Sequence, residues 1–276
     1  MFGITFTPFR AVFAVLAAFA LAGAAFIFSG SFRRAESPTL EERAGLPPLA
    51  TATPSFYAAQ GKPSAPSQVE GPPPYQGAAI HLLNPDENFL KQVPEETYRK
   101  SLEELAALAV RLADNPADID GWMRVAYIKH FYGDEFGTRD VYEYLNLAAD
   151  NAPIPFYNLA LLYGYYLKEP IKAVPKFEAA ISRDRVNAEF YVGFSDFYRD
   201  VMQDPPAAER VLLSALARLP NELNIEIALA SLYRIMEELE KSIAYYERAL
   251  FHPSLGGQER AAITDELARL RQKLGK

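Results

Sequence analysis

Glu240-Lys-Ser-Ile-Ala-Tyr-Tyr-Glu-Arg-Ala-Leu, residues 240–250, is the stretch of sequence that decides the fold, and Pro253 follows it. Ser242, Tyr246 and Ala249 lie four and three residues apart, so they share one face of a helix. Small side chains on that face allow a second helix to approach closely, and a proline cannot continue the helix. The stretch therefore predicts a helix that packs tightly against a neighbour.

The same spacing of small and large residues recurs upstream. Two earlier helices carry it as Ala208, Leu212, Ala215 and as Ala173, Phe177, Ala180. Each predicted helix of this kind is preceded by another that contains large residues, a small residue and then an aromatic residue. In three units the residues of this preceding helix are Phe156, Leu159, Ala160, Tyr163; Tyr191, Phe194, Ser195, Tyr198; and Leu229, Ala230, Tyr233.

A fourth unit, the first along the chain, fits the pattern less well. Its first helix contains Trp122, Val125 and Ala126, but Lys129 occupies the aromatic position. Glycines at 133 and 137 predict a longer loop between the two helices. With that loop, the expected register of the second helix aligns Val141, Leu145 and Ala148 with the other units.

These units resemble the tetratricopeptide (TPR) family, whose repeat of about 34 residues is a pair of antiparallel helices. The resemblance implies an all-α, antiparallel helical-hairpin solenoid over residues 95–276. A helix over 95–114 precedes the repeats, and a helix over 258–274 with a polar outer face caps them. A generic helical bundle is the alternative, but the fixed spacing of aromatic, alanine and proline residues favours the repeat.

The resemblance also implies a groove lined by the first helix of each hairpin. Carried onto this chain, the groove positions of the family form an aromatic half and a charged half. The residues are Met123, Tyr127, His130, Phe131, Tyr157, Asn158, Leu161, Tyr165, Glu189, Asp196, Arg199, Asp200, Asn224, Ser231 and Arg234. Family members that clamp a peptide carboxylate cluster Lys, Arg and Asn there, and this chain lacks the cluster. Core packing is the alternative role for the aromatic residues.

An apolar segment precedes all of this. After the tail of residues 1–10, no charged residue occurs over residues 11–32. These 22 residues would span roughly 33 Å as a helix, close to the thickness of the hydrocarbon core of a bilayer. Cleavage as a signal peptide after Ala20-Leu21-Ala22 is the alternative. Phe26-Ile27-Phe28 extends the apolar run past that point, which favours a transmembrane helix or uncleaved anchor.

The orientation of this span follows only weakly from charge. Arg10 lies on one side of it, and Arg33, Arg34 and Arg43 lie on the other. That count slightly favours a cytoplasmic C-terminal side, whereas long domains are often translocated despite such a bias. We favour a single-pass membrane protein whose repeat domain is extracytoplasmic, and the opposite orientation stays open.

Residues 33–76 read as a disordered, proline-rich linker. Nine prolines lie between positions 36 and 76, and small or polar residues fill most of the rest. Such a segment has few side chains to bury and favours extended polyproline II structure. Residues 77–94 form a transitional segment with apolar residues that can pack on the helical domain.

Charge and composition narrow the functional classes. The net charge is −7, and residues 77–276 carry −8 of it, which argues against nucleic acid as a partner. The chain has no cysteine, and none of its three histidines has a second histidine three or four residues away. No nucleophile or phosphate-binding motif is present. We therefore expect no enzyme activity, cofactor, metal site or small-molecule substrate.

The resulting hypothesis is a membrane-anchored scaffold or adaptor that binds a protein or peptide in the groove. An assembly chaperone or an accessory subunit of an envelope complex is the alternative. Residues 111–118 with Gly121-Trp122 resemble the entry into the repeat domain of membrane-anchored cytochrome c maturation factors, over about a dozen residues. The single span expected here departs from the two that are usual in those factors.

Overall fold

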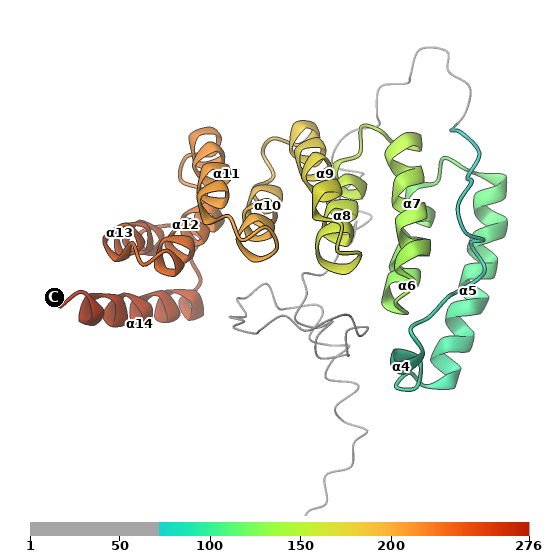
Figure 1. Cartoon of the computed structure of the whole chain (residues 1–276), viewed down its shortest axis with the longest axis horizontal. Helices are drawn as coiled ribbons and strands as arrows, with labels where there is room; N and C mark the ends of the chain where they lie inside the picture. The colour runs from blue at the N-terminus through green and yellow to red at the C-terminus, as the bar shows by residue number, and fades with distance from the viewer. Residues whose placement is uncertain (1–71, 276) are drawn as a thin grey trace, which may run out of the picture. The chain divides into compact units, whose positions relative to one another are not determined.

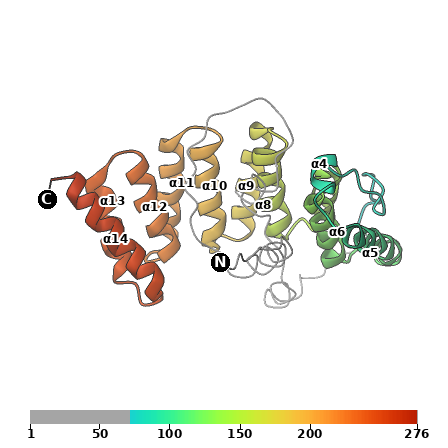
Figure 2. The same cartoon turned by 90° about the horizontal axis from the view of Figure 1, so that it is seen from below.

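The computed structural model describes residues 72–275, which fold into helices without any strand. Figures 1 and 2 show these helices side by side in the order of the chain. The helices are α4 (Glu87–Leu90), α5 (Glu95–Asp114), α6 (Ile119–Phe131), α7 (Glu135–Ala148), α8 (Pro153–Leu161), α9 (Pro170–Arg183), α10 (Ala188–Asp200), α11 (Pro205–Arg218), α12 (Leu223–Ile235), α13 (Leu239–Leu250) and α14 (Gly257–Lys273). A π-helical turn, η1 (Leu162–Tyr166), continues α8.

Four helical hairpins make up most of the described chain: α6 with α7, α8 with α9, α10 with α11, and α12 with α13. Each hairpin crosses at two small residues that are at most 2% exposed. In the first helices these residues are Ala126, Ala160, Ser195 and Ala230, and in the second helices they are Thr138, Ala173, Ala208 and Ser242. Their short side chains allow the two backbones to approach, so that large residues fill the space between hairpins. The expected stack of helical hairpins is confirmed at this level.

The ends of the helices follow local chemistry. Asp118, Asp134 and Asp204 accept hydrogen bonds from backbone N–H groups in the first turns of α6, α7 and α11. Such caps satisfy donors that have no partner inside the helix. Pro170 and Pro205 open α9 and α11, because the first helical position needs no N–H donor.

The first hairpin corrects the sequence prediction. Its loop is only residues 132–134, as short as residues 167–169 of the second hairpin, and Gly137 lies inside α7. A Cβ on Gly137 would come within 2.4 Å of the Asp134 carboxylate that caps the helix, so glycine is needed there for space. The register therefore aligns Thr138, Tyr142 and Leu145 with the other hairpins. The longer loop and the alignment through Val141, Leu145 and Ala148 were wrong.

Residues 72–86 form an extended segment, here called the strap, that runs along the first hairpin. Lys129 Nζ donates to the backbone oxygen of Leu82 at 2.5 Å and to Asp134 Oδ2 at 2.9 Å. Ala78 N donates to Asp140 Oδ2 at 3.0 Å. Residues 72–76, which the sequence prediction assigned to the linker, thus belong to the strap, and the transitional segment 77–94 is the rest of the strap followed by α4 and a short turn.

Asn146 departs from the repeating pattern, and its side chain has no hydrogen-bond partner within the described residues. It is 7% exposed, and neither its amide oxygen nor its amide nitrogen has a hydrogen-bond partner there. The positions that match it in the following hairpins are Ile181, Leu216 and Leu250. An apolar side chain is therefore the normal occupant of this site at the end of a second helix.

None of the helices within residues 72–275 is long and apolar enough to cross a membrane. The predicted transmembrane segment, 11–32, and the linker from residue 33 to residue 71 lie outside the described residues. All the described helices belong to one compact unit.

Replacing Asn146 by Leu should stabilise the helical domain. A buried amide without partners costs about 1–3 kcal/mol, and the leucine restores an apolar contact. We expect the Tm to rise, by roughly 2–4 °C for each kcal/mol in a domain of this size. The reverse change at the matching position, Leu216→Asn, should lower the Tm. A Tm for Asn146→Leu equal to or below that of the parent chain would contradict this account.

Candidate partner-binding surface

The candidate site is the surface of the first helices α6, α8, α10 and α12, which carry the groove positions. The structure divides nine of these groove positions into two groups. Met123, Tyr157, Asn158, Leu161 and Tyr165 are at most 8% exposed. Tyr127 is 45% and Phe131 is 36% exposed, and the side chains of Arg199 and Arg234 are 24% and 32% exposed. Only the second group can contact a partner without rearrangement.

Tyr157 shows why members of the first group are buried. Its ring lies 4.8 Å from the ring of Phe190 and 5.7 Å from that of Phe177. A Cβ added to Gly193 would come within 2.0 Å of the Tyr157 hydroxyl, so α10 approaches α8 closely at this glycine. Tyr157 is therefore a packing residue that joins the second hairpin to the third.

Asn158 and Tyr165 also have structural roles. Asn158 Nδ2 donates to the Tyr142 hydroxyl at 3.1 Å, a bond between α8 and α7. The Tyr165 ring lies edge-on to Phe197 of α10 at 6.3 Å. Burial raises the pKa of the Tyr165 hydroxyl above its ordinary range, and the carboxylates of Asp196 and Asp200 add to the effect. These residues belong to the core, which is the alternative that the sequence left open.

Helix α8 is uncharged and buried on every side. No charged residue occurs between positions 151 and 167, and all nine residues of the helix are buried. A helix of this composition belongs in the interior of a domain. The second hairpin therefore contributes packing, and the accessible groove positions lie on the hairpins to either side of it.

The first accessible end of the surface is aromatic and lies on α6. The guanidinium of Arg124 sits 5.2 Å from the centre of the Tyr127 ring, and its Nε donates to Glu104 Oε1 at 2.6 Å. Phe131 lies edge-on to Phe89 of α4 at 5.3 Å. This end combines half-exposed aromatic rings with a cation, a combination that is enriched in protein interfaces.

His130, at another groove position, lies beside this aromatic end. Its Nδ1 is 2.8 Å from Glu135 Oε2, and its ring lies edge-on to Tyr166 at 4.5 Å. Within residues 72–275, no group of three or more His, Asp or Glu side chains is placed to hold a metal ion. His130 thus makes a polar contact within the first hairpin and a ring contact with the second.

The second accessible end is charged and lies on α10. Arg199 Nη1 donates to Asp196 Oδ1 at 2.5 Å, and its Nε and Nη2 donate to the two oxygens of Asp200 at 2.6 Å each. Lost hydration raises the pKa of the Asp196 carboxyl from its ordinary value of 3.8 to about 6. Arg199 opposes this rise and Asp200 reinforces it. One arginine thus pairs with two carboxylates, and the three groups together carry a net negative charge.

The last hairpin contributes Arg234 to the charged end. Arg234 Nε lies 3.5 Å from Glu266 Oε1 on the capping helix α14. Glu226, which occupies the position of Trp122, Phe156 and Tyr191 in the other hairpins, is 3% exposed and accepts a hydrogen bond from Arg248 Nη2 at 2.6 Å. Arg234 is therefore already paired within the protein, and a partner would have to compete with Glu266 for it.

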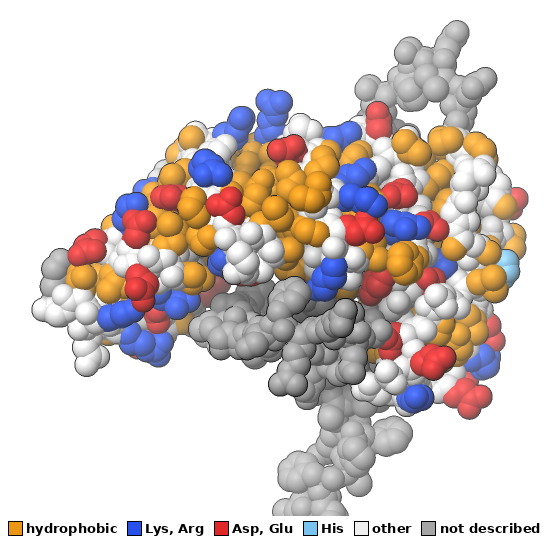
Figure 3. All heavy atoms as spheres, viewed as in Figure 1, with side chains coloured by type: hydrophobic (Ala, Val, Ile, Leu, Met, Phe, Trp, Pro, Cys, Tyr) orange, Lys and Arg blue, Asp and Glu red, His pale blue; other side chains and the backbone are white. Residues whose placement is uncertain are grey.

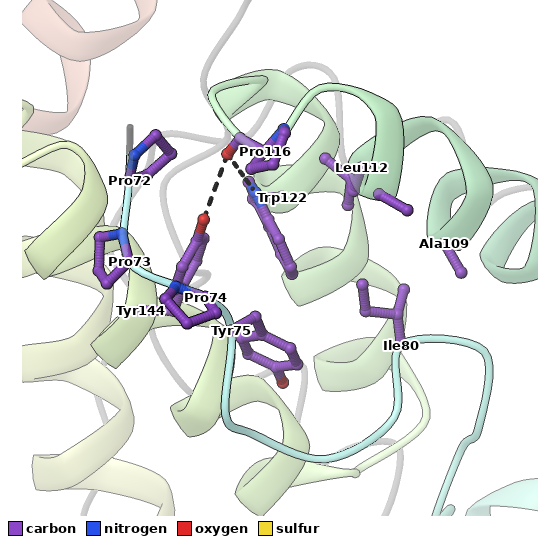
Figure 4. A pocket seen from close by; sticks show the side chains of 11 residues that line it. Pro72, Pro73, Pro74, Tyr75, Ile80, Ala109, Leu112, Pro116, Trp122 and Tyr144 are labelled. Carbon is purple, nitrogen blue, oxygen red and sulfur yellow. Dashed lines mark hydrogen bonds between the residues drawn. The ribbon is translucent and has the colours of Figure 1, made fainter. Parts of the chain in front are cut away.

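The packing of Tyr75 on the first hairpin was not predicted from the sequence. Tyr75, assigned to the linker, lies against Trp122 and Tyr144 of the first hairpin, with ring centres 4.9 and 5.4 Å away. Beside it the strap and helix α5 border a pocket of about 370 Å³ (Figure 4). A tyrosine directly after three prolines was the available signal, because a spacer needs no large aromatic residue.

Large apolar side chains are also exposed away from the first helices. Leu147, Ile171, Val186 and Phe251 are between 71% and 89% exposed, and they lie on second helices or in turns. Figure 3 shows hydrophobic side chains gathered over the middle hairpins, with charged side chains of both signs around them. These exposed residues provide comparison positions for experiments on the first helices.

Comparisons with known proteins do not assign the chain to a family. No protein-family model matches it, and no curated protein matches its sequence. The resemblance to the tetratricopeptide family therefore rests on the spacing of its own residues and stays a prediction.

Tyr157 and Tyr127 should respond differently to truncation. Tyr157→Ala removes a buried ring and leaves a cavity, which we expect to lower the free energy of unfolding by about 3–5 kcal/mol. Tyr127→Ala removes a half-exposed ring and should change it by less than about 1 kcal/mol. Denaturant unfolding followed by circular dichroism measures both. Equal effects of the two changes would show that the burial pattern described for α6 and α8 is wrong.

Asp196 should make stability depend on pH. The folded protein keeps the Asp196 proton up to about pH 6, whereas the unfolded chain releases it near pH 4. Between these values the folded state binds more protons, so this contribution to stability is present at low pH and is lost as the pH rises. Asp196→Asn should flatten the dependence of Tm on pH in this window. The exposed Asp265→Asn on α14 should keep the slope of the parent chain.

Proposed function

We propose that this chain is a membrane-anchored interaction scaffold of the tetratricopeptide type, which recruits a protein or peptide partner on its first helices. The observation that supports the proposal is the shared crossing of the four hairpins at pairs of small buried residues. Stacked hairpins of this kind present long surfaces and no deep cleft, which suits binding. The same architecture is used by many proteins without catalytic activity.

The contact residues are those that remain accessible. Tyr127 and Phe131 offer aromatic area on α6, and Asp196, Arg199 and Asp200 offer charge on α10. Because the buried α8 separates the two ends, a partner binds through two separate contacts, one aromatic and one polar. Two such contacts made by one partner give a higher affinity than either alone.

The membrane part of the proposal rests on sequence. Residues 11–32 are long and apolar enough for one span, and the proline-rich residues that follow are suited to a spacer. The repeat domain then acts on partners at a membrane surface, on its extracytoplasmic side. The residues that resemble cytochrome c maturation factors have local structural roles: Asp118 caps α6, and Trp122 Nε1 donates to Pro116 O. We therefore do not propose that alternative further.

Site-specific crosslinking in membranes tests this function. A photoreactive amino acid placed at position 127 or 199 should crosslink the same partner protein, because both positions lie on the first helices. The exposed comparison positions 171 and 186 should give no such product. Protease treatment of intact and opened cells in the same experiment reports which side of the membrane holds the domain. Crosslinks from 171 and 186 but not from 127 and 199 would reject the assigned surface.

A further inference from the structure

One face of helix α10 carries acidic side chains at helical spacing. Glu189, Asp196 and Asp200 follow one another at intervals of seven and four residues, so they lie on the same face of the helix. Gly193 lies between the first two on this face, and α8, which neighbours α10 in Figures 1 and 2, passes close to it. Glu189 and Asp200 are exposed, and the side chain of Asp196 is 37% exposed. A partner can therefore reach all three carboxylates, which we call the acidic face.

Glu189 is the member of the acidic face whose charge is not compensated. Its backbone N–H donates to Asn187 Oδ1 at 3.1 Å, but within residues 72–275 its carboxylate makes no ion pair and no hydrogen bond. Lost hydration raises the pKa of this carboxyl, because neighbouring atoms crowd it. Asp196 and Asp200 are both paired with Arg199. The acidic face therefore carries more negative than positive charge, and Glu189 is the carboxylate left to bind a cation.

Two tyrosines of the second hairpin direct their hydroxyls toward the acidic face. The Tyr157 and Tyr165 side chains are 4% and 8% exposed, and within the described residues neither hydroxyl makes a hydrogen bond. Neither hydroxyl oxygen is fully shielded from solvent. Burial raises the pKa of both hydroxyls, and the carboxylate of Asp196 adds to the effect on each. Glu189 contributes at Tyr157, and Asp200 contributes at Tyr165. The two oxygens thus lie beside the carboxylates and are free to accept a hydrogen bond.

These groups together fit a cation that brings several N–H donors. Carboxylate and tyrosine oxygens both accept hydrogen bonds, whereas an anion would be repelled here. An uncharged group would take water from Glu189 without supplying a charge in return. The acidic side chains within residues 72–275 form no group of three or more placed to hold a metal ion. Residues 151–167 contain no charged residue, so α8 supplies no cation either.

We infer that the acidic face binds a basic segment of a partner protein, with a lysine or arginine side chain held by Glu189 above the Tyr157 hydroxyl. The charge complementarity is local, because it depends on one carboxylate without a partner and on hydroxyls that lie beside it. The inference rests on the proposed function, since it names the chemistry of the partner that binds the charged end of the first helices.

Titration with short peptides tests this preference. The full-length protein is titrated with dye-labelled tetralysine and with the same peptide after acetylation of its side-chain amines. We expect a saturable rise in fluorescence anisotropy with tetralysine, a lower affinity at higher salt, and no binding of the acetylated peptide. Equal binding of the two peptides, or no binding of tetralysine, would overturn the inference.

Glu189→Gln provides the first variant, because it removes the charge and keeps the size of the side chain. It should weaken tetralysine binding at least about fivefold. Glu240→Gln is the matched control: it removes the same charge from an exposed position on the second helix α13 and should change the affinity less than about twofold. Equal weakening by the two variants would show only attraction to the net charge of the protein, and would overturn the assigned site.

Tyr157→Phe tests the part of the site that does not depend on net charge. The ring and its packing on Phe190 remain, and the lost hydroxyl has no hydrogen bond within residues 72–275, so the Tm should not fall. Tetralysine binding should weaken about threefold, because the bound cation loses an acceptor. An affinity equal to that of the parent chain would overturn the assigned position of the basic side chain.

The crosslinking experiment distinguishes this inference from the proposed function. If a photoreactive residue at position 199 captures a partner and Glu189→Gln reduces the product, both are supported. If Glu189→Gln leaves the product unchanged, the partner is held by other chemistry, and the inference fails while the scaffold stands. If no partner is captured, the proposed function fails, and the peptide titrations still report the preference of the acidic face for a basic segment.

Discussion

The close crossing of two helices within each hairpin is the constraint on which the rest of the structure depends. At the crossing, Ala126 faces the second helix that carries Thr138, and Ala230 and Ser242 meet in the same way in the last hairpin, where the Ser242 hydroxyl donates to the Ala230 oxygen at 2.8 Å. A larger residue at either position would separate the helices and displace the rings that fill the space between hairpins. The accessible residues of α6 and α10 owe their places to these small, buried side chains.

Much of this architecture could be predicted because it is set by contacts that are local or that repeat. The predicted helix over residues 95–114 agrees with α5 residue for residue. The longer loop predicted from the glycines was wrong, because Gly137 makes room for a capping carboxylate inside a helix and does not mark a loop. The strap could not be foreseen, since Lys129 reaches the oxygen of Leu82 from 47 positions away, and no periodic pattern reports such a contact. The same limit applies to the candidate site. The burial of Tyr157 depends on Gly193 in the next hairpin, which its own helix does not reveal.

Three polar residues interrupt the repeat, and each does so with a different outcome. Lys129 stands where the other hairpins have a tyrosine, and it uses its charge to bind Asp134 and hold the strap. Glu226 stands in the place of a large aromatic residue and pairs with Arg248. Asn146 has no partner within residues 72–275. Departures from a repeat are therefore the positions where this chain gains a specific connection or loses stability, whereas the conforming positions supply generic packing.

The attachment of the strap also has a mechanical consequence. Three hydrogen bonds fasten it to the first hairpin at successive points: Ala78 N to Asp140, Lys129 to Leu82 O, and Asp86 N to Tyr132 O at 2.9 Å. A pull transmitted along the chain to Pro72 meets this segment before it meets any helix. The contacts of Tyr75, Ala78, Leu82 and Asp86 are loaded one after another from that end, so helix α5 and the hairpins behind it bear no load until the strap has detached. The strap thus protects the helical hairpins from a force applied through the N-terminal part of the chain.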